Sequence, residues 1–140
     1  MKLMNNSLTQ YTQNSFKAID YLVAIPLHPA RLREREFNQS ELIAKELSRE
    51  LQKPLVPALK KIRHTKSQTA LNRTQRLLNL AGAFAINDNI CIKDKNILLV
   101  DDVATTTATI TEAASLLKKS GAHSICALTF AKGSNNEDPA

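Results

Sequence analysis

The most constraining feature of this 140-residue chain is a strand–helix–strand pattern in its last third. Residues 97–100 read Ile-Leu-Leu-Val and are continuously apolar, which is typical of a strand covered on both faces. Residues 109–120 repeat apolar side chains at helical spacing and end before Gly121, and a second apolar run covers 124–130. Such a unit predicts parallel strands joined by a right-handed crossover. The fold class we expect is therefore α/β, with an open parallel sheet flanked by helices.

The elements expected in the rest of the chain are shorter. They are a helix over 7–20, a strand over 21–25, a loop over 27–37, a helix from a cap at Asn38 to residue 51, a strand over 55–62, a loop over 63–79, a strand over 83–86 and a turn over 87–89. In the cap sequence Asn-Gln-Ser-Glu, the side chain of Glu41 can reach back to the cap. The length argues for one domain over 1–140, with a core over about 21–131, a polar segment over 1–20 and a tail over 133–140.

Two adjacent acids, Asp101 and Asp102, directly follow the apolar run 97–100. Ligands of open α/β sheets bind beyond the carboxyl ends of the strands. A loop predicted over 101–107 leads there into a helix N-terminus, whose free backbone N–H groups favour phosphate. Four threonines add hydroxyl donors: Thr105, Thr106, Thr107 and Thr109. Two carboxylates beside a phosphate cradle suit a sugar phosphate, because the carboxylates can accept hydrogen bonds from vicinal hydroxyls.

Two other interpretations of this segment are open to a reader of the sequence. Acids often follow strands, and threonine-rich loops also cap helices without binding a ligand. A receiver domain of a phosphorelay carries an acidic pair after an apolar strand too, but its phospho-accepting Asp follows later in the chain. Only 38 residues follow Asp102 here, and the next acid, Glu112, lies within the predicted helix. We therefore set the receiver domain aside.

The basic excess of the chain is confined to one segment. The net charge is +6, from 19 Lys and Arg against 13 Asp and Glu. Residues 51–87 contain no acid and seven bases, so the rest of the chain has 12 bases and 13 acids. The seven are Lys53, Lys60, Lys61, Arg63, Lys66, Arg73 and Arg76. This favours an anionic partner that is met at one place. The lack of Trp and an aromatic content of 4% weigh against single-stranded nucleic acid held by stacking.

Three blocks of the sequence resemble one family. Residues 98–109, Leu-Leu-Val-Asp-Asp-Val-Ala-Thr-Thr-Thr-Ala-Thr, are similar to the signature of type I phosphoribosyltransferases. Residues 25–39, Ile-Pro-Leu-His-Pro-Ala-Arg-Leu-Arg-Glu-Arg-Glu-Phe-Asn-Gln, look like a block of the ComF family, competence-associated proteins with a phosphoribosyltransferase fold. A further ComF-like block contains Gln68, Leu71, Arg73, Arg76, Asn79 and Gly82-Ala-Phe84. The blocks stand in the family's order, and the resemblance covers about residues 21–131.

The ComF resemblance implies a protein that binds phosphoribosyl pyrophosphate with Mg²⁺ and transfers the phosphoribosyl group to an acceptor that the sequence does not name. Asp101 and Asp102 would be the catalytic pair, in contact with the ribose hydroxyls and Mg²⁺. The residues that would hold the 5′-phosphate are Ala104, Thr105, Thr106, Thr107, Ala108 and Thr109. The residues that would face pyrophosphate or belong to a flap over the site are His28, Arg31, Gln68, Arg73 and Arg76. Mg²⁺ and fixed cations would neutralise the leaving pyrophosphate.

The chain departs from the family pattern at Thr107 and Glu36, which stand where the family has Gly, and it shows no cysteine-rich zinc ribbon. Glycine at the first position lets the backbone approach phosphate closely and adopt positive φ. One alternative is therefore a non-catalytic competence or DNA-uptake module that binds single-stranded DNA through the basic segment 53–76. A remnant that folds without activity is a third.

The two cysteines bear on where the protein works. Cys91 and Cys126 form no C-x-x-C pair and lie in or beside apolar runs, which predicts reduced thiols in a cytoplasmic protein. Residues 1–14 are polar and lack the apolar core of a signal peptide. No apolar run approaches the ~18 residues that a membrane span requires. The sequence leaves the oligomeric state open.

Overall fold

Three parallel strands form the centre of the protein. The computed structural model describes residues 17–27, 29–35, 37–63, 72, 74–75, 81–104 and 108–132. The strands are β1 (Tyr21–Ala24), β4 (Asn96–Ala104) and β5 (Ser124–Lys132), in the order β1-β4-β5. Tyr21 is opposite Ile97, which in turn is opposite Ile125. Both pairings are parallel, which confirms the expected open parallel sheet.

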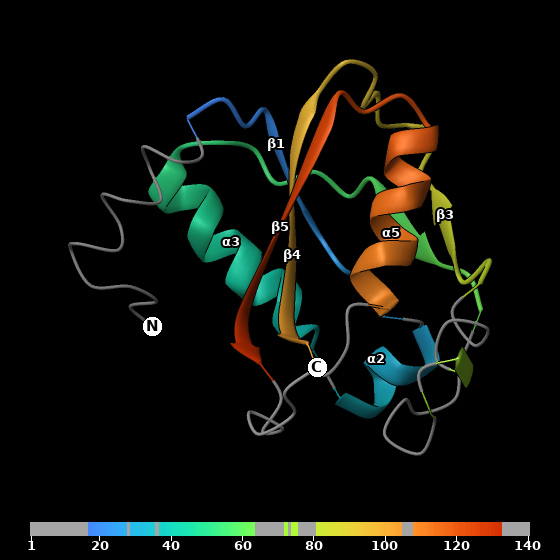
Figure 1. The fold of residues 1–140 in the computed structure, drawn as a ribbon. Helices are drawn as coiled ribbons and strands as arrows, with labels where there is room; N and C mark the ends of the chain where they lie inside the picture. Colours follow the sequence, from blue (N-terminus) through green and yellow to red (C-terminus); the bar gives the residue numbers. More distant parts are fainter. Residues whose placement is uncertain are drawn as a thin grey trace.

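Helices cover the sheet on opposite faces, α3 (Gln39–Leu51) on one and α5 (Ala108–Lys119) on the other (Figure 1). Side chains of β4 alternate between the two sides, as the two-residue period of a strand requires. Leu98 and Val100 pack into a cluster with α3, whereas Ile97 and Leu99 pack into one with α5. All four are fully buried, which explains why residues 97–100 are continuously apolar.

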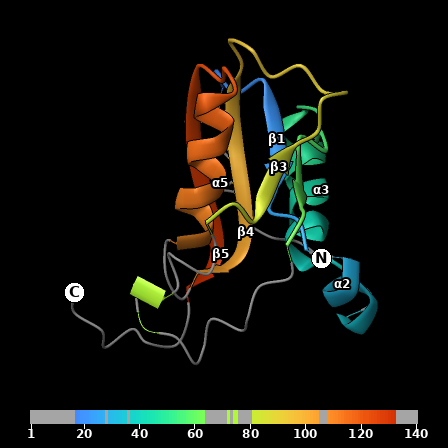
Figure 2. The ribbon, with the colours of Figure 1, turned by 90° about the vertical axis from the view of Figure 1, so that its right-hand side faces the viewer.

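A two-stranded antiparallel hairpin lies on the α5 side of the sheet (Figure 2). Its strands are β2 (Leu59–Lys61) and β3 (Phe84–Ile86), and Leu59 and Phe84 pack into the same cluster as α5. The expected strand over 83–86 and the turn at Asp88 and Asn89 are confirmed. The expected strand over 55–62 is wrong over most of its length, since residues 59–61 alone are a strand and Leu55 makes an isolated bridge to Leu22.

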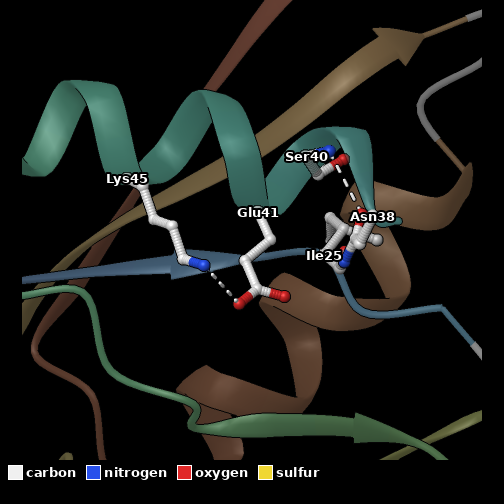
Figure 3. Close-up of polar contacts among 5 residues, drawn as sticks. All are labelled: Ile25, Asn38, Ser40, Glu41 and Lys45. Atoms are coloured by element: carbon white, nitrogen blue, oxygen red, sulfur yellow. Dashed lines mark hydrogen bonds and ion pairs between the residues drawn. The ribbon is translucent and has the colours of Figure 1, made fainter. Parts of the chain in front are cut away.

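The N-terminal cap of α3 is the residue that the sequence predicts. Asn38 has an extended backbone, and its Oδ1 accepts a hydrogen bond from the backbone N–H of Ser40, 3.1 Å away. Such a cap satisfies one of the free N–H groups of the first turn. The carboxylate of Glu41 does not complete the expected capping box: its Oε1 lies 3.5 Å from the ammonium of Lys45, one turn along the helix (Figure 3). At the other end, Gln52 adopts the left-handed conformation with φ of 56°.

Three further expectations are corrected by the structure. Residues 29–35, expected as a loop, form the helix α2 (Pro29–Arg35), since proline at the first position of a helix loses no hydrogen bond and Arg, Leu and Glu favour helix. The end of the expected helix over 7–20 is wrong, because residues 17–18 form a turn and Asp20 instead bonds to Asn96. Residues 7–16 and the expected tail over 133–140 lie outside the described residues.

The third correction concerns the candidate site directly. Residues 101–104 continue β4 and are not a loop, because β5 supplies partners as far as Ala104, opposite Lys132. Asp101 is itself paired with Thr129. The two acids therefore stand on a strand fixed by a neighbour, which restrains their backbone more than a loop would.

None of the helices that the structure describes is long and apolar enough to cross a bilayer.

Candidate functional site

The candidate site lies where the carboxyl ends of the parallel strands meet helix N-termini. The first turn of α3 stands beside the ends of β1 and β4, and α5 begins at Ala108 after the threonine-rich segment. Helix α2 lies at the same end of the sheet (Figure 1). Helix N-termini at this edge present free N–H groups and the positive end of the helix dipole. The position matches the edge at which open α/β sheets bind ligands.

The acidic pair is held by a serine from α3. The Oγ atom of Ser40 lies 3.1 Å from Oδ1 of Asp101 and 3.4 Å from Oδ1 of Asp102. The backbone N–H of Asp102 donates both to this Oγ, at 3.1 Å, and to Oδ1 of Asp101, at 2.9 Å. Ser40 and Asp101 are buried, with 4% and 8% of their surfaces exposed, and Asp102 is half-buried. One hydroxyl therefore contacts both carboxylates of the pair.

The pKa of Asp101 is raised from the usual 3.8 to about 6, and burial is the largest cause. The hydrogen bond with the neighbouring Asp102 carboxylate and its negative charge contribute to the same rise. The hydrogen bonds from Ser40 and from the backbone of Asp102 act in the opposite direction, because they stabilise the ionised form. Asp101 is thus ionised at neutral pH, but with a proton affinity well above that of a surface aspartate.

Asn38 links the same helix turn to β1. Its Nδ2 donates to the carbonyl oxygen of Ile25, 3.0 Å away, just after the strand ends (Figure 3). The backbone N–H of Ile25 in turn donates to the carbonyl of Val100, at 2.9 Å. The residues before Asp101 and the first turn of α3 are therefore joined through the end of β1.

The structure brings together only part of the predicted site. Asp101 and Asp102 lie together as expected, Ala104 ends β4, and Ala108 and Thr109 open α5. The backbone of Arg31 lies in α2. The remaining predicted site residues lie outside the described part of the chain: His28, Gln68, Arg73, Arg76, Thr105, Thr106 and Thr107. Their contacts with a ligand stay predictions.

Ser40 was missed by the sequence reasoning. The signal was present, because Ser40 lies three, four and seven residues before Ile43, Ala44 and Leu47, the other buried positions of α3. A polar residue on the apolar face of a helix is buried and needs a hydrogen-bond partner. The sequence does not reveal that the partner is an acidic pair 61 residues further along the chain.

The acidic pair fits Mg²⁺ only as an ion shared with a substrate. Within the described residues, no group of three or more His, Cys, Asp or Glu side chains is close enough to hold a metal. Mg²⁺ prefers oxygen ligands and commonly uses one or two carboxylates together with substrate phosphates and water. Asp101 and Asp102 supply that number of carboxylates.

A hollow of about 300 Å³ lies at the end of β1 beside the cap of α3. Its polar lining consists of Asn38, Glu41 and Lys45, and the rest is mostly apolar. The apolar lining residues are Ala24, Pro26, Leu55, Val56, Pro57 and Leu59. Asn38 therefore stands at once against this hollow and in the turn that carries Ser40.

Comparison with known proteins gives consistent results for sequence and fold. A family model described as phosphoribosyl transferase domain matches residues 38–140. The chain is 35% identical over 115 residues to Competence protein F of Haemophilus influenzae, covering 80% of this chain and 50% of that protein. It is 36% identical over 107 residues to DNA utilization protein YhgH of Escherichia coli K12, covering 76% and 46%. Competence protein ComFC of Bacillus subtilis is 37% identical over 110 residues, covering 78% and 43%.

These relatives confirm the ComF resemblance, and the chain spans about half the length of each of them. Solved structures agree on the fold. Adenine phosphoribosyltransferase of Saccharomyces cerevisiae superposes with a TM-score of 0.58 at 19% identity, covering 91% of this chain and 70% of that one. A hypoxanthine phosphoribosyltransferase of Staphylococcus aureus gives 0.57 at 14% identity, covering 92% and 61%.

Proposed function

Because the chain belongs to the phosphoribosyl transferase domain family, we propose that it binds phosphoribosyl pyrophosphate together with Mg²⁺ at the Asp101–Asp102 pair. The observation that carries this proposal is the pair itself, two carboxylates at the carboxyl end of β4, oriented by Ser40 and followed closely by the start of α5. Transfer of the phosphoribosyl group to an acceptor is the activity we propose for the site. Exposed, unpaired Cys91 and Cys126 agree with the cytoplasmic location included in the proposal.

The role of each part follows from its chemistry. Ionised carboxylates accept hydrogen bonds, so Asp101 and Asp102 suit the vicinal hydroxyls of a ribose. The N-terminus of α5 suits the 5′-phosphate, with Thr109 in its first turn and Thr105 to Thr107 before it. A ligand that joins a ribose to a phosphate spans both features at once.

Departure of pyrophosphate from C1′ leaves positive charge on the sugar and negative charge on the leaving group. Mg²⁺, when bound with the substrate, would neutralise negative charge on the pyrophosphate oxygens. The carboxylates of Asp101 and Asp102 stabilise the positive sugar and keep its hydroxyls in place. In this proposal His28 and Arg31 face the pyrophosphate, and Gln68, Arg73 and Arg76 cover the site and keep water from the reactive sugar.

Titration calorimetry tests the proposal on the wild-type chain. Phosphoribosyl pyrophosphate is titrated at millimolar concentration with Mg²⁺ and again with a chelator, and ribose 5-phosphate serves as the smaller ligand. We expect binding with Mg²⁺, weaker binding without it and an increase in melting temperature with ligand. The proposal fails if neither ligand produces binding heat or a change in melting temperature.

A second candidate function is single-stranded DNA binding by the basic segment. It is favoured by the names of the relatives, which include DNA utilization protein YhgH and Competence protein F, and by the position of the described basic residues. Lys60 and Arg63 are exposed on and just after β2, and the ammonium of Lys61 lies 5.9 Å from the ring centre of Phe84. Three cations are thus gathered on and just after one hairpin strand.

The salt dependence of DNA binding and competition between the two ligands distinguish the two functions. Binding of single-stranded DNA should weaken steeply as salt rises, with a smaller slope for Lys60→Ala combined with Lys61→Ala. Lys119→Ala, which removes an exposed charge at the far end of α5, is the control and should leave the slope unchanged. An identical slope for the double variant would count against the DNA function, and competition by phosphoribosyl pyrophosphate would place both ligands at one site.

A further inference from the structure

We propose that the first turn of α3 is a positioning clamp for the acidic pair, with Ser40 fixing the carboxylates and Asn38 fixing the end of β1 relative to them. The clamp is visible as a closed ring of contacts. Ser40 bonds to Asp101, Val100 accepts from Ile25, Ile25 accepts from Asn38, and Asn38 accepts from the backbone of Ser40. The ligand readouts below rest on the proposed function, whereas the spectroscopic readout does not.

The contacts of Ser40 are specific to positioning. A hydroxyl has one hydrogen to donate and two lone pairs to accept with. The Oγ of Ser40 accepts the N–H of Asp102 and has its hydrogen left for one carboxylate oxygen, either Oδ1 of Asp101 at 3.1 Å or Oδ1 of Asp102 at 3.4 Å. Both oxygens thus lie within reach of one buried donor, which restrains the side-chain torsions of two neighbouring acids.

Two adjacent carboxylates repel each other, so a donor within reach of both lowers the cost of holding their oxygens close together. A pair that must accept hydrogen bonds from two neighbouring hydroxyls of one sugar needs its oxygens on the same side. Placing the donor on a helix, not on a loop, fixes it more precisely. Ser40 lies one residue into α3, and the helix packs through Ile43 and Leu47 onto Leu98 and Val100 of the sheet.

Asn38 has a different task within the same turn. Its Oδ1 caps the helix while its Nδ2 holds the carbonyl of Ile25, after which the chain continues to Pro26 and Leu27. That continuation leads to the segment proposed to face pyrophosphate. The ring therefore fixes the end of β1, which precedes that segment, relative to the acidic pair, through two side chains that are two residues apart.

Three variants separate positioning from stability. Ser40→Ala removes the donor, Ser40→Thr keeps it, and Ser48→Ala is the matched control, because Ser48 is a half-buried serine of the same helix whose Oγ donates to the carbonyl of Lys53. Carbon-13 resonances of the Asp101 and Asp102 carboxyl groups are recorded without ligand, at one alkaline pH that is the same for every variant. Affinity for phosphoribosyl pyrophosphate with Mg²⁺ is measured on the same samples.

We expect Ser40→Ala to shift both carboxyl resonances and to weaken ligand affinity about tenfold, as for a lost hydrogen bond to a charged group. Ser40→Thr should restore both, and Ser48→Ala should change neither. Unshifted carboxyl resonances in Ser40→Ala overturn the clamp, whether or not the ligand binds. If Ser40→Ala shifts the carboxyl resonances but the wild-type protein binds no ligand, the clamp is supported and the proposed function is overturned. If Ser40→Ala does not fold, Ser40→Cys, a weak donor of similar size, takes its place.

The two halves of the clamp are distinguished by Asn38→Ser. Serine caps helices about as well as asparagine but is too short to donate to Ile25 from the same position. We expect the affinity for phosphoribosyl pyrophosphate to fall severalfold, with the carboxyl resonances of Asp101 and Asp102 unchanged. Unchanged affinity in a variant of a protein that binds the ligand overturns the role assigned to Asn38.

Discussion

The backbone N–H of Gly82 donates a hydrogen bond to the carboxylate of Glu112, with 3.1 Å between the nitrogen and Oε1. Glu112 stands in the second turn of α5, and Gly82 leads into β3 with φ of 68°, a conformation that glycine adopts freely. Beside it, the guanidinium of Arg63 donates to the carbonyl of Ala81 at 2.6 Å. The residues that lead into β3 are therefore fastened to the helix that begins at the candidate phosphate position.

Loss of this contact should loosen the residues that lead into β3. In Glu112→Ala we expect the amide of Gly82 to exchange with solvent about fivefold faster, which corresponds to a lost hydrogen bond of about 1 kcal/mol. Glu112→Gln keeps an acceptor and should exchange at nearly the wild-type rate. Hydrogen exchange followed by nuclear magnetic resonance measures both, and equal exchange rates in wild type and Glu112→Ala would show that the contact does not restrain Gly82.

Asp101 should make the protein less stable as pH rises. Its pKa is about 6 in the folded protein against the usual 3.8, so the folded state holds more protons than the unfolded state between these values. The free energy of unfolding therefore falls across this range, by at most about 3 kcal/mol. Asp101→Asn removes this titration while its Oδ1 still accepts hydrogen bonds.

Urea denaturation over a series of pH values tests this expectation. Relative to wild type, Asp101→Asn should gain stability progressively from pH ~4 to pH ~6 and hold a constant advantage above that range. Asp88→Asn, at an exposed turn, is the control for removal of a carboxylate. If the difference in unfolding free energy between Asp101→Asn and wild type does not vary with pH, the pKa of Asp101 is not raised in the folded protein.

The cap and the clamp function of Asn38 should contribute separately to stability. Asn38→Ala loses both the helix cap and the bond to Ile25, so we expect a loss of about 2 kcal/mol. Asn38→Ser keeps the cap and should lose about 1 kcal/mol. Equal unfolding free energies for the two variants, measured by chemical denaturation, would mean that the cap adds nothing to stability, and a wild-type value for Asn38→Ser would mean that the contact with Ile25 adds nothing.

Thr107 is the departure from the family pattern that bears most on ligand affinity. It lies outside the described residues, and the pattern has Gly at this position of the phosphate segment. We expect Thr107→Gly to bind phosphoribosyl pyrophosphate severalfold more tightly, because glycine lets the backbone approach phosphate without a β-branched side chain. Thr107→Ser keeps the hydroxyl and should resemble wild type. Weaker binding by Thr107→Gly would indicate that the threonine side chain itself contacts the ligand.

The parts of the fold that the sequence predicts well are those set by local patterns. The four apolar residues before Asp101, the helical spacing after Thr109 and the cap at Asn38 each depend on neighbours in the chain, and each is confirmed. The pairing of β4 with β5 beyond Asp101 depends on a distant partner. The predicted strand therefore ends at residue 100, whereas β4 continues to Ala104.

The same reason explains the errors at the site. The loop expected over 27–37 is wrong where Pro29 opens α2, because helix starts and loops favour the same residue. Ser40 was missed because its role exists only after α3 has packed beside the end of β4. The acidic pair itself was found from its position after a buried strand, where the reasoning needs no distant contact.

The dissociation constant of phosphoribosyl pyrophosphate in the presence of Mg²⁺, compared between wild type and Asp102→Asn, tests the central claim most directly. Asp102→Asn preserves shape but replaces a charged acceptor for the ribose hydroxyl with a neutral one, so binding should weaken by at least about tenfold. Asp88→Asn should bind as wild type does. Wild-type affinity in Asp102→Asn would contradict the assignment of the acidic pair as the ribose-binding site.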